Sequence, residues 1–450
     1  MPPRFFSLLA ALFLLALPLA AQTSVKDDPL LRMPGTQPDQ GVNLEGSNRC
    51  LNCHGGYDTA AEPGFNWKGS MMAQAARDPM WYACLAVAAQ DSIWALGNPN
   101  ATDLCIRCHS PAGWLGGRSE PTNVSALTGD DFDGLSCDFC HTTWDPFFED
   151  TYHGLREGSD WSGYWDEAGN TGPGSGTLSQ NEADLTYVED ATLALGIRLL
   201  TGQDLFVANR PRYATYDANG SGQFFVSTSS QKRASFADAA ARHQMLYSRV
   251  HKSKHMCETC HDVSNPVLAN LGLSGLPDQS GGADQISEQY SAYSYMHVER
   301  TFSEFMSSAY GQPGGAATNP EFQAQGAPDI TWAAKCQDCH MRDVVGVGCN
   351  KKGVPVRPDE STEHPESGMP LHDLTGGNLW VSHILASVDP GGPVYDPTNA
   401  QLMGQGPAVL TLDLAAGQGP IGNGAALKAG ADRAAQQLRL AATFTDASYD

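Results

Sequence analysis

Cysteine pairs followed directly by histidine are the residues in this sequence whose type and spacing could do chemistry. The pentapeptide Cys-x-x-Cys-His occurs five times, at 50–54, 105–109, 137–141, 257–261 and 336–340. This is the attachment signature of haem c, in which two thiols form thioether links to one porphyrin. The two-residue gap lets one turn of chain present both sulfurs to the same macrocycle edge, and the following His becomes the proximal ligand of the iron.

The sequence therefore predicts five covalently attached haems c. The predicted thioether cysteines are Cys50, Cys53, Cys105, Cys108, Cys137, Cys140, Cys257, Cys260, Cys336 and Cys339. The predicted proximal ligands are His54, His109, His141, His261 and His340. Zinc sites and a disulfide framework are the alternatives, but zinc needs no His after every second Cys, and five units do not divide into four-ligand sites. Cys84 and Cys349 are left over, and in an oxidising compartment they could form one disulfide.

A six-coordinate haem iron also needs a distal ligand, usually His or Met. The stronger candidates among the remaining histidines are His243, His251, His255, His297 and His372, and the weaker ones are His153, His364 and His383. Gly376 and Gly377 follow His372 and would let the backbone approach a macrocycle. Met72 is the methionine candidate, although a Met on a helix is more often part of the core. A methionine-ligated haem would have a higher potential than the bis-His haems.

The composition argues against binding to nucleic acids or to anionic membranes. The 450 residues carry a formal net charge of −23, whereas both of those partners select Lys and Arg patches. The acidic chain fits basic redox proteins as partners, or cations and minerals as extracellular electron acceptors. The length would allow two or three ordinary domains. Abundant glycine and proline, 47 and 28 residues, suit loops that wrap around cofactors.

The first residues have the pattern of a secretory signal peptide, which we place at 1–21. Arg4 supplies the positive charge, 5–17 is the apolar run, and Ala20 and Ala21 offer a cleavage site. No Cys follows the apolar run, so a lipoprotein anchor is not expected. No later stretch is long and apolar enough to span a bilayer. We therefore expect an exported protein, periplasmic or extracellular at the cell surface.

The spacing of the motifs divides the rest of the chain. We predict a linker at 22–49, a three-haem region at 50–145, a haem-free insertion at 146–256, a two-haem region at 257–385 and a C-terminal segment at 386–450. Hydrophobic periodicity predicts helices at 65–76, 78–96, 184–200, 234–250 and 285–309, with the first two separated at Pro79. Residues 110–136 have the composition of a loop, and 408–414 and 438–444 are strand-like. The expected fold class is mostly α with extensive coil, wrapped around stacked haems, with a small β-rich C-terminal segment.

The motifs and their flanks resemble the exported multihaem c-type cytochromes related to the nitrogen-cycle tetrahaem and octahaem cytochromes, the group that includes hydroxylamine oxidoreductase. The stretches that carry the resemblance are 67–73 with 77–79, 108–111, 134–141, 260–263 with 265–266, 299–301, and His372 with 376–378. The resemblance implies a helix-and-coil fold with closely packed haem pairs. In this family the position of Met72 is commonly a His ligand, so the Met departs from the pattern. Related chains often continue into a β-rich domain, which suggests that this sequence is a truncated form.

Electron transfer is the leading functional interpretation, because several low-spin haems with close edges form a wire and need no substrate chemistry. On this interpretation the protein is not an enzyme. The main alternative is a reductase or oxidase of a small nitrogen or sulfur compound, with one open haem and a pocket of donors from Tyr293, Tyr295, His297 and Arg300. A third interpretation is a subunit of an oligomer, extracellular filament or surface complex.

Overall fold

The structure is a computed structural model that describes most of the motif-bearing parts of the chain. The described residues are 24–25, 35–38, 40–144, 206–207, 210–211, 222–236, 239, 241–269, 295–312, 315–318, 332–361, 368–404 and 420–441. The predicted signal peptide, the helix at 184–200, the strand at 408–414, and the residues His153, Tyr293 and His364 lie outside them.

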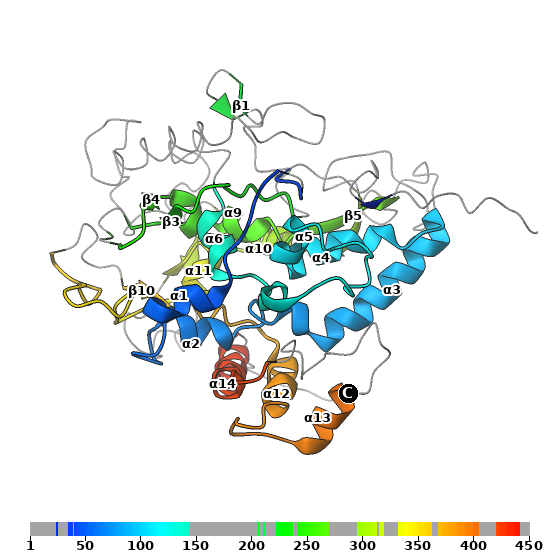
Figure 1. The fold of residues 1–450 in the computed structure, drawn as a ribbon. Coiled ribbons are helices and arrows are strands. Elements are labelled where there is room, and N and C mark those ends of the chain that lie inside the picture. The colour runs from blue at the N-terminus through cyan, green and yellow to red at the C-terminus, as the bar shows by residue number, and fades with distance from the viewer. Residues whose placement is uncertain are drawn as a thin grey trace, which may run out of the picture.

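Helices and coil dominate the described residues, and the sheets among them have two strands each (Figure 1). The α-helices are α1 (Ser47–His54), α2 (Pro63–Lys68), α3 (Pro79–Leu96), α4 (Asp103–His109), α5 (Pro111–Leu115), α6 (Cys137–Thr142), α9 (Lys254–Glu258), α10 (Thr301–Ser307), α11 (Cys336–His340), α12 (Leu379–Ser387), α13 (Pro397–Met403) and α14 (Gly424–Ala441). Short 3₁₀ helices lie at η2 (Ala75–Arg77), η3 (Asn100–Thr102), η4 (Gly129–Asp133) and η8 (Arg249–Lys252). The predicted mostly helical class with extensive coil is confirmed at this level.

The strands form small antiparallel pairs, apart from one parallel pair. The antiparallel pairs are β1 (Phe206–Val207) with β2 (Arg210–Pro211), β5 (Val263–Ala269) with β6 (Tyr295–Glu299), β7 (Ala316–Ala317) with β8 (Trp332–Ala333), and β9 (Asp343–Val344) with β10 (Met369–Pro370). The parallel pair is β3 (Lys232–Ala234) with β4 (Met245–Tyr247). No helix of the described residues is both long and apolar enough to cross a membrane.

Helix α3 begins and ends where its sequence signals place it, so the helix predicted at 78–96 is confirmed. The Asp78 side chain accepts a hydrogen bond from Met80 N at 2.8 Å, and Pro79 occupies the first helical position, where its missing N–H costs nothing. Gly97 has φ 76° and donates its N–H to Ile93 O at the other end, the left-handed C-terminal cap that glycine favours.

The helix predicted at 65–76 is wrong in its second half. Helix α2 ends at Lys68, and turns lead into η2. The cause is a close approach of α2 to α14, because a Cβ on Gly69 would lie 2.3 Å from Ala426 O and one on Gly430 would lie 2.0 Å from Gly69 O. The Gln74 side chain then donates to Lys68 O at 3.0 Å and closes the turn.

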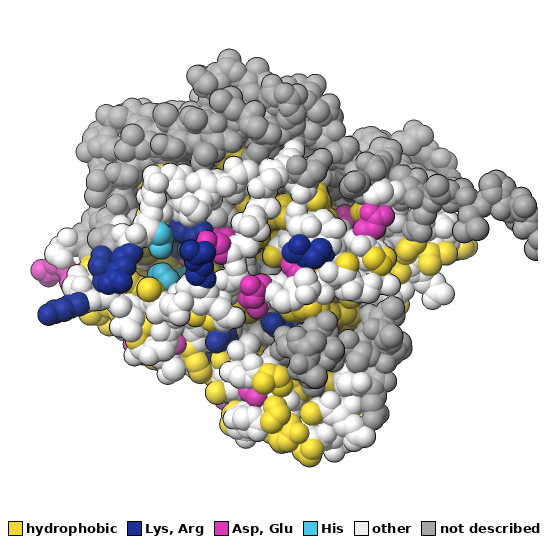
Figure 2. Space-filling model, in the orientation of Figure 1, with side chains coloured by type: hydrophobic (Ala, Val, Ile, Leu, Met, Phe, Trp, Pro, Cys, Tyr) yellow, Lys and Arg dark blue, Asp and Glu magenta, His cyan; other side chains and the backbone are white. Residues whose placement is uncertain are grey.

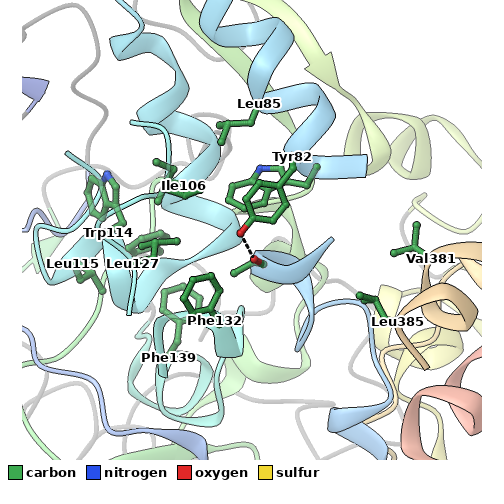
Figure 3. Packing of buried hydrophobic residues seen from close by; sticks show 14 of the residues in the cluster. Tyr82, Leu85, Ile106, Trp114, Leu115, Leu127, Phe132, Phe139, Val381 and Leu385 are labelled. Atoms are coloured by element: carbon green, nitrogen blue, oxygen red, sulfur yellow. Dashed lines mark hydrogen bonds between the residues drawn. The ribbon is translucent and has the colours of Figure 1, made fainter. Parts of the chain in front are cut away.

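The main hydrophobic core lies between α3, α4, α5 and α6 (Figure 3). Leu85, Ile106, Trp114 and Phe139 are all buried there. Two polar groups inside it are paired. Trp114 Nε1 donates to Asp103 Oδ2 at 2.8 Å, and the Tyr82 hydroxyl donates to Ala76 O at 3.0 Å, as the dashed line shows. This core supports two of the motifs, those on α4 and α6. Residues 110–136, predicted as loop, are mostly turns, interrupted by α5 and η4.

The C-terminal segment is helical where it is described, so the strand predicted at 438–444 is wrong over residues 438–441. Helix α14 buries Leu427, Gly430, Ala431 and Ala434, the i, i+3, i+4, i+7 spacing of one helix face. This face packs against α12, and Figure 1 shows α12, α13 and α14 grouped together below α2 and α3. Alanine-rich sequence favours helix here, and the local alternation of apolar residues did not decide the structure.

Two other predicted helices are wrong for tertiary reasons. The described residues within 234–250 include β4 and the start of η8 rather than one helix, because β4 pairs in parallel with β3 beside the third motif. Among 295–309, the part of the second predicted helix that the structure describes, β6 pairs with β5 and Thr301–Ser307 is helical. In both places backbone pairing to a distant strand overrides local helix propensity.

Candidate functional site

Each Cys-x-x-Cys-His motif lies on a short helix or at its end. Helices α1, α4, α6 and α11 contain both cysteines and the histidine of their motifs. In the fourth motif Cys257 is on α9, and the turn continues because His261 N donates to Cys257 O at 2.9 Å. With 3.6 residues per turn, cysteines three apart lie on one side of the helix. This is the arrangement that two thioethers to one porphyrin require.

Four of the five proximal histidines share one hydrogen-bond pattern. The Nδ1 atom of each donates to a backbone carbonyl that is distant in the sequence. The partners are Gly348 O for His54 (2.7 Å), Ala75 O for His109 (3.1 Å), Arg233 O for His141 (2.7 Å) and Thr375 O for His340 (2.5 Å). A carbonyl only accepts, so Nδ1 carries the proton and Nε2 keeps its lone pair. Metal-ligating histidines are oriented in this way, so these residues fit an iron ligand at Nε2.

Burial also favours the neutral form of four proximal imidazoles, His54, His109, His141 and His261, and the neutral form is the one that binds a metal. Burial lowers the pKa of His109 to about 4, against a weaker opposing effect of its hydrogen bond to Ala75. Burial lowers the pKa values of His54, His141 and His261 as well. Removal from water disfavours the charged imidazolium.

Two of the predicted distal histidines lie opposite proximal ones. The ring centres of His54 and His243 are 6.4 Å apart, and those of His141 and His372 are 6.2 Å apart. Two imidazoles on one metal should have centres about 6 Å apart, given metal–nitrogen bonds of about 2 Å and about 1 Å from each nitrogen to its ring centre. His372 Nδ1 donates to Pro370 O at 2.9 Å, so its Nε2 is free to ligate as well. The spacing therefore fits bis-His ligation at the first and third motifs.

His251 competes with His372 for the place beside His141. Its ring centre is 5.7 Å from that of His141. However, His251 uses Nε2 to donate to Cys140 O at 2.7 Å, and its buried Nδ1 has no hydrogen-bond partner among the described residues. His251 could ligate only through Nδ1, the more crowded nitrogen. Burial lowers the pKa of His251 to about 3 and that of His372 to about 4, so both are neutral.

The other predicted distal ligands are not brought beside a proximal histidine by any described contact. His255 is buried, pairs with Glu258 at 2.5 Å, and packs its ring against Phe302. His297 lies on β6 opposite Ser264, and its side chain is outside the described part. His383 is exposed on α12. These residues stay candidates from the sequence.

Met72 acts in the structure through its backbone. Its carbonyl accepts from Leu135 N at 3.0 Å, and Trp67 Nε1 donates to Leu135 O at 2.9 Å. A Cβ on Gly134, which has φ 59°, would lie 2.3 Å from Met72 O. The 67–72 stretch thus holds the residues that lead into the third motif. The Met72 side chain is half-buried, and its role as a ligand stays a prediction.

Thiols of different motifs touch one another, which shows how the motifs are arranged. The pairs are Cys50–Cys137, Cys108–Cys260 and Cys257–Cys336. In each pair the hydrogen bond to the partner thiol, together with burial, raises the pKa of the second cysteine well above its usual range. Cys140 is also close enough to Cys260 to contribute to that rise. The three contacts join the first motif to the third, and the fourth motif to both the second and the fifth. The third motif lies near the fourth through Cys140 and Cys260.

The predicted Cys84–Cys349 disulfide is wrong, because both thiols are free. Cys84 is on the exposed side of α3 and lies near Cys105, whose pKa it helps to raise. Cys349 lies on a loop against the first motif, where Asn350 N donates to Cys53 O at 2.7 Å. The two residues therefore lie beside different motifs, Cys84 beside the second and Cys349 beside the first.

Some residues of the site could not be singled out from the sequence. The carbonyl acceptors of the histidines are backbone atoms, so no residue type marks them. Trp81 stacks on His109, with ring centres 4.7 Å apart and planes 5° apart, and this contact would orient the imidazole. A buried ion pair between Lys232 and Asp138 lies beside the Cys50–Cys137 contact. In the sequence, the feature that could have pointed to this ion pair is Asp138, the charged residue inside the third motif.

Comparison with known proteins points to the same chemistry. Searches of the curated proteins and of the solved structures found no match. Residues 49–142 match the family model of cytochrome c554 and c-prime, a stretch that begins just before the first motif and ends with α6 after the third. This match supports a c-type cytochrome with covalently bound haem c and a role in electron transfer.

Proposed function

We propose that the chain is a pentahaem c-type cytochrome that carries electrons between redox partners outside the cytoplasm. The observation that supports this most is the closeness of the motifs, because three pairs of thiols from different motifs contact each other and Cys140 lies near Cys260. Haem c would supply an iron that gains or loses one electron without breaking a bond. The relation to hydroxylamine oxidoreductase is not needed for this proposal.

The residues of the chain have separate roles in this function. The ten motif cysteines would hold the porphyrins, and the backbone carbonyls would fix each proximal His with Nε2 toward the metal. His243 and His372 would be the distal ligands at the first and third motifs. The apolar core behind α4 and α6 excludes water, which keeps the surroundings of a buried redox group from reorganising when its charge changes.

Mass spectrometry and spectroscopy of the protein from a host that matures c-type cytochromes test the proposal directly. We expect a mass increase of five haems, a haemochrome spectrum that counts five, and EPR signals of low-spin bis-His iron. Fewer than five haems, or a mass equal to the bare polypeptide, would contradict it. Mutation of one motif at a time, Cys to Ala at both positions, should remove one haem each.

A reductase or oxidase of a small nitrogen or sulfur compound is the second candidate, and one observation favours it. The Glu299 carboxylate lies near His261, where it opposes the lowering of the pKa of that His by burial. Glu299 Oε1 is buried without a hydrogen-bond partner among the described residues. Because His261 is the predicted proximal ligand, this carboxylate would act on a substrate at an open fourth haem through that imidazole, whose donation of electrons to the iron its negative charge would strengthen. The predicted donor Arg300, by contrast, pairs with Asp262 at 3.5 Å.

Spectra and turnover separate the two functions. A high-spin signal together with reduction of nitrite or hydroxylamine that falls in Glu299→Gln would favour the enzyme. Low-spin spectra throughout and no turnover would favour the electron carrier.

A further inference from the structure

The surface over the first motif is cationic, in a chain whose net charge is −23. Arg49 lies on α1 itself with its side chain 74% exposed, one turn before Cys53. Arg242 is exposed and directly precedes His243, whose ring faces His54. Lys351 and Lys352 are on the loop that packs on α1 through the hydrogen bonds of Gly348 and Asn350. Figure 2 shows Lys and Arg side chains gathered beside His side chains on the face where α1 lies. We call Arg49, Arg242, Lys351 and Lys352 the motif-1 patch.

Three carboxylates near this patch are ion-paired or buried, whereas Asp58 is exposed. Glu45 is ion-paired with Arg49 at 2.8 Å, and the buried Asp138 is ion-paired with Lys232. Glu62 is buried and accepts hydrogen bonds from the N–H groups of residues 57 and 58. Asp58 caps its own turn by accepting from Ala60 N. Arg242 and Lys352 form no ion pair with any described residue, so their charge remains directed at solvent.

The first motif reaches the surface. Cys53 and the facing His243 are exposed, whereas Cys108 of the second motif is buried and Cys140 and Cys260 are half-buried. His340 of the fifth motif is exposed as well. An electron could therefore cross the surface at the first motif. Local charge dominates such an encounter at physiological salt, because the Debye length is about 8 Å. The remote acidic surface is screened at that distance.

We propose that the motif-1 patch is the docking surface for a redox protein whose cofactor is surrounded by acidic residues. This inference rests on the proposed electron-carrier function. It adds the kind of partner and the place on the surface where electrons enter or leave. The net charge alone suggests a basic partner, whereas the charge of this patch favours an acidic one. Positive charge around an exposed redox centre attracts an acidic face, and this steers the encounter and fixes its orientation.

Small redox anions test the patch in the intact holoprotein. One electron passes from the reduced protein to hexacyanoferrate(III), which becomes hexacyanoferrate(II), and no bond forms or breaks. At an ionic strength of about 0.01 M, where the Debye length is about 30 Å, the double variant Arg242→Glu and Lys352→Glu should react about tenfold more slowly. With the cation hexaammineruthenium(III) the same variant should react faster. Both differences should vanish at high salt.

A matched control separates local charge from net charge. Lys428→Glu with Arg439→Glu on α14 changes the net charge equally, on a helix without a motif. This control should leave the hexacyanoferrate rate close to that of the parent. Equal slowing in both double variants, or no slowing in the motif-1 variant, overturns the proposal.

Binding without electron transfer gives an independent readout. Calorimetric titration of the oxidised holoprotein with hexacyanocobaltate(III), a redox-inert trianion, should show binding that the motif-1 variant loses and the α14 variant retains. Binding retained by the motif-1 variant contradicts the proposal. If the purified protein contains no haem, the proposed function fails instead, and the haemochrome spectrum tells that failure apart from this one.

Discussion

The first and third motifs use the same local device in opposite surroundings. In both, the proximal His donates Nδ1–H to a distant backbone carbonyl at 2.7 Å. Around His54 there is one facing imidazole, from the exposed His243, under a cationic surface. Around His141 there are two facing imidazoles, His251 and His372, both half-buried. The motif itself therefore determines which cofactor binds. The residues around the motif determine whether the bound cofactor is exposed to partner proteins or exchanges electrons only with the neighbouring motifs.

The largest effect on stability should come from Gly134, where the chain that leads into the third motif passes close to Met72. Gly134 combines φ 59° with a Cβ position only 2.3 Å from Met72 O, so Gly134→Ala meets both backbone strain and overpacking. We expect a loss of about 3 kcal/mol or more in the free energy of unfolding, measured by denaturant titration. Gly353→Ala on the loop beside the first motif is the matched control, because its φ is 85° but nothing lies within 4 Å of its Cβ. That variant should lose only about 1 kcal/mol, and equal losses would remove the contrast between the two regions.

Replacing one of the two histidines beside His141 should decide which is the ligand. His372→Ala should convert one low-spin EPR signal to high spin, because His372 leaves Nε2 free and His251 does not. His251→Ala should keep every low-spin signal and lower only stability. His383→Ala, an exposed change on α12, should do neither. The reverse result for the first two variants would assign His251 as the ligand.

Rescue by a small ligand should distinguish the open site from the closed one. His243→Gly should lose a low-spin signal that added imidazole restores, because His243 is exposed. His372→Gly should require more imidazole, since His372 is half-buried. Titration of the visible spectrum gives both affinities, and we expect them to differ by about tenfold or more. Similar affinities would show that the two sites are equally open.

The smallest effects should come from tyrosines beside these regions. Tyr82→Phe removes the hydrogen bond to Ala76 O in the core, and Tyr57→Phe removes the one to Val347 O near the first motif. We expect a cost of about 1 kcal/mol for the buried Tyr82 and less for the half-buried Tyr57.

The pH dependence of the parent follows from the same two groups. Burial raises the pKa of both Tyr57 and Tyr82 above the ordinary value of 10.0. The unfolded chain therefore ionises first, so their contribution to stability is complete below pH 10 and is lost as the pH rises above it. Melting temperatures from pH 8 to pH 11 should fall more steeply in the parent than in either Phe variant. Parallel curves would contradict this assignment.

The sequence predicted the parts of the structure that depend on local signals. The Asp78-Pro79 start and the Gly97 end of α3 need only the residues at its ends, and each motif is a single turn. The strands β4 and β6 were predicted as helix, because their pairing partners lie elsewhere in the chain. The facing of His54 by His243 depends on the path of the chain between them, so the sequence could nominate His243 but could not pair it. The 67–73 stretch was singled out from the sequence. In the structure the Met72 carbonyl accepts a hydrogen bond from Leu135 N, just before the third motif.

The acceptors that orient the proximal histidines have a consequence for mutational robustness. Ala75, Arg233, Gly348 and Thr375 contribute main-chain oxygens, which every amino acid possesses. The identity of the side chain at these positions therefore does not set the electronic character of the imidazoles, provided that the path of the chain is kept. The path of the backbone therefore sets the orientation and basicity of the proximal histidines, and single substitutions rarely change that path.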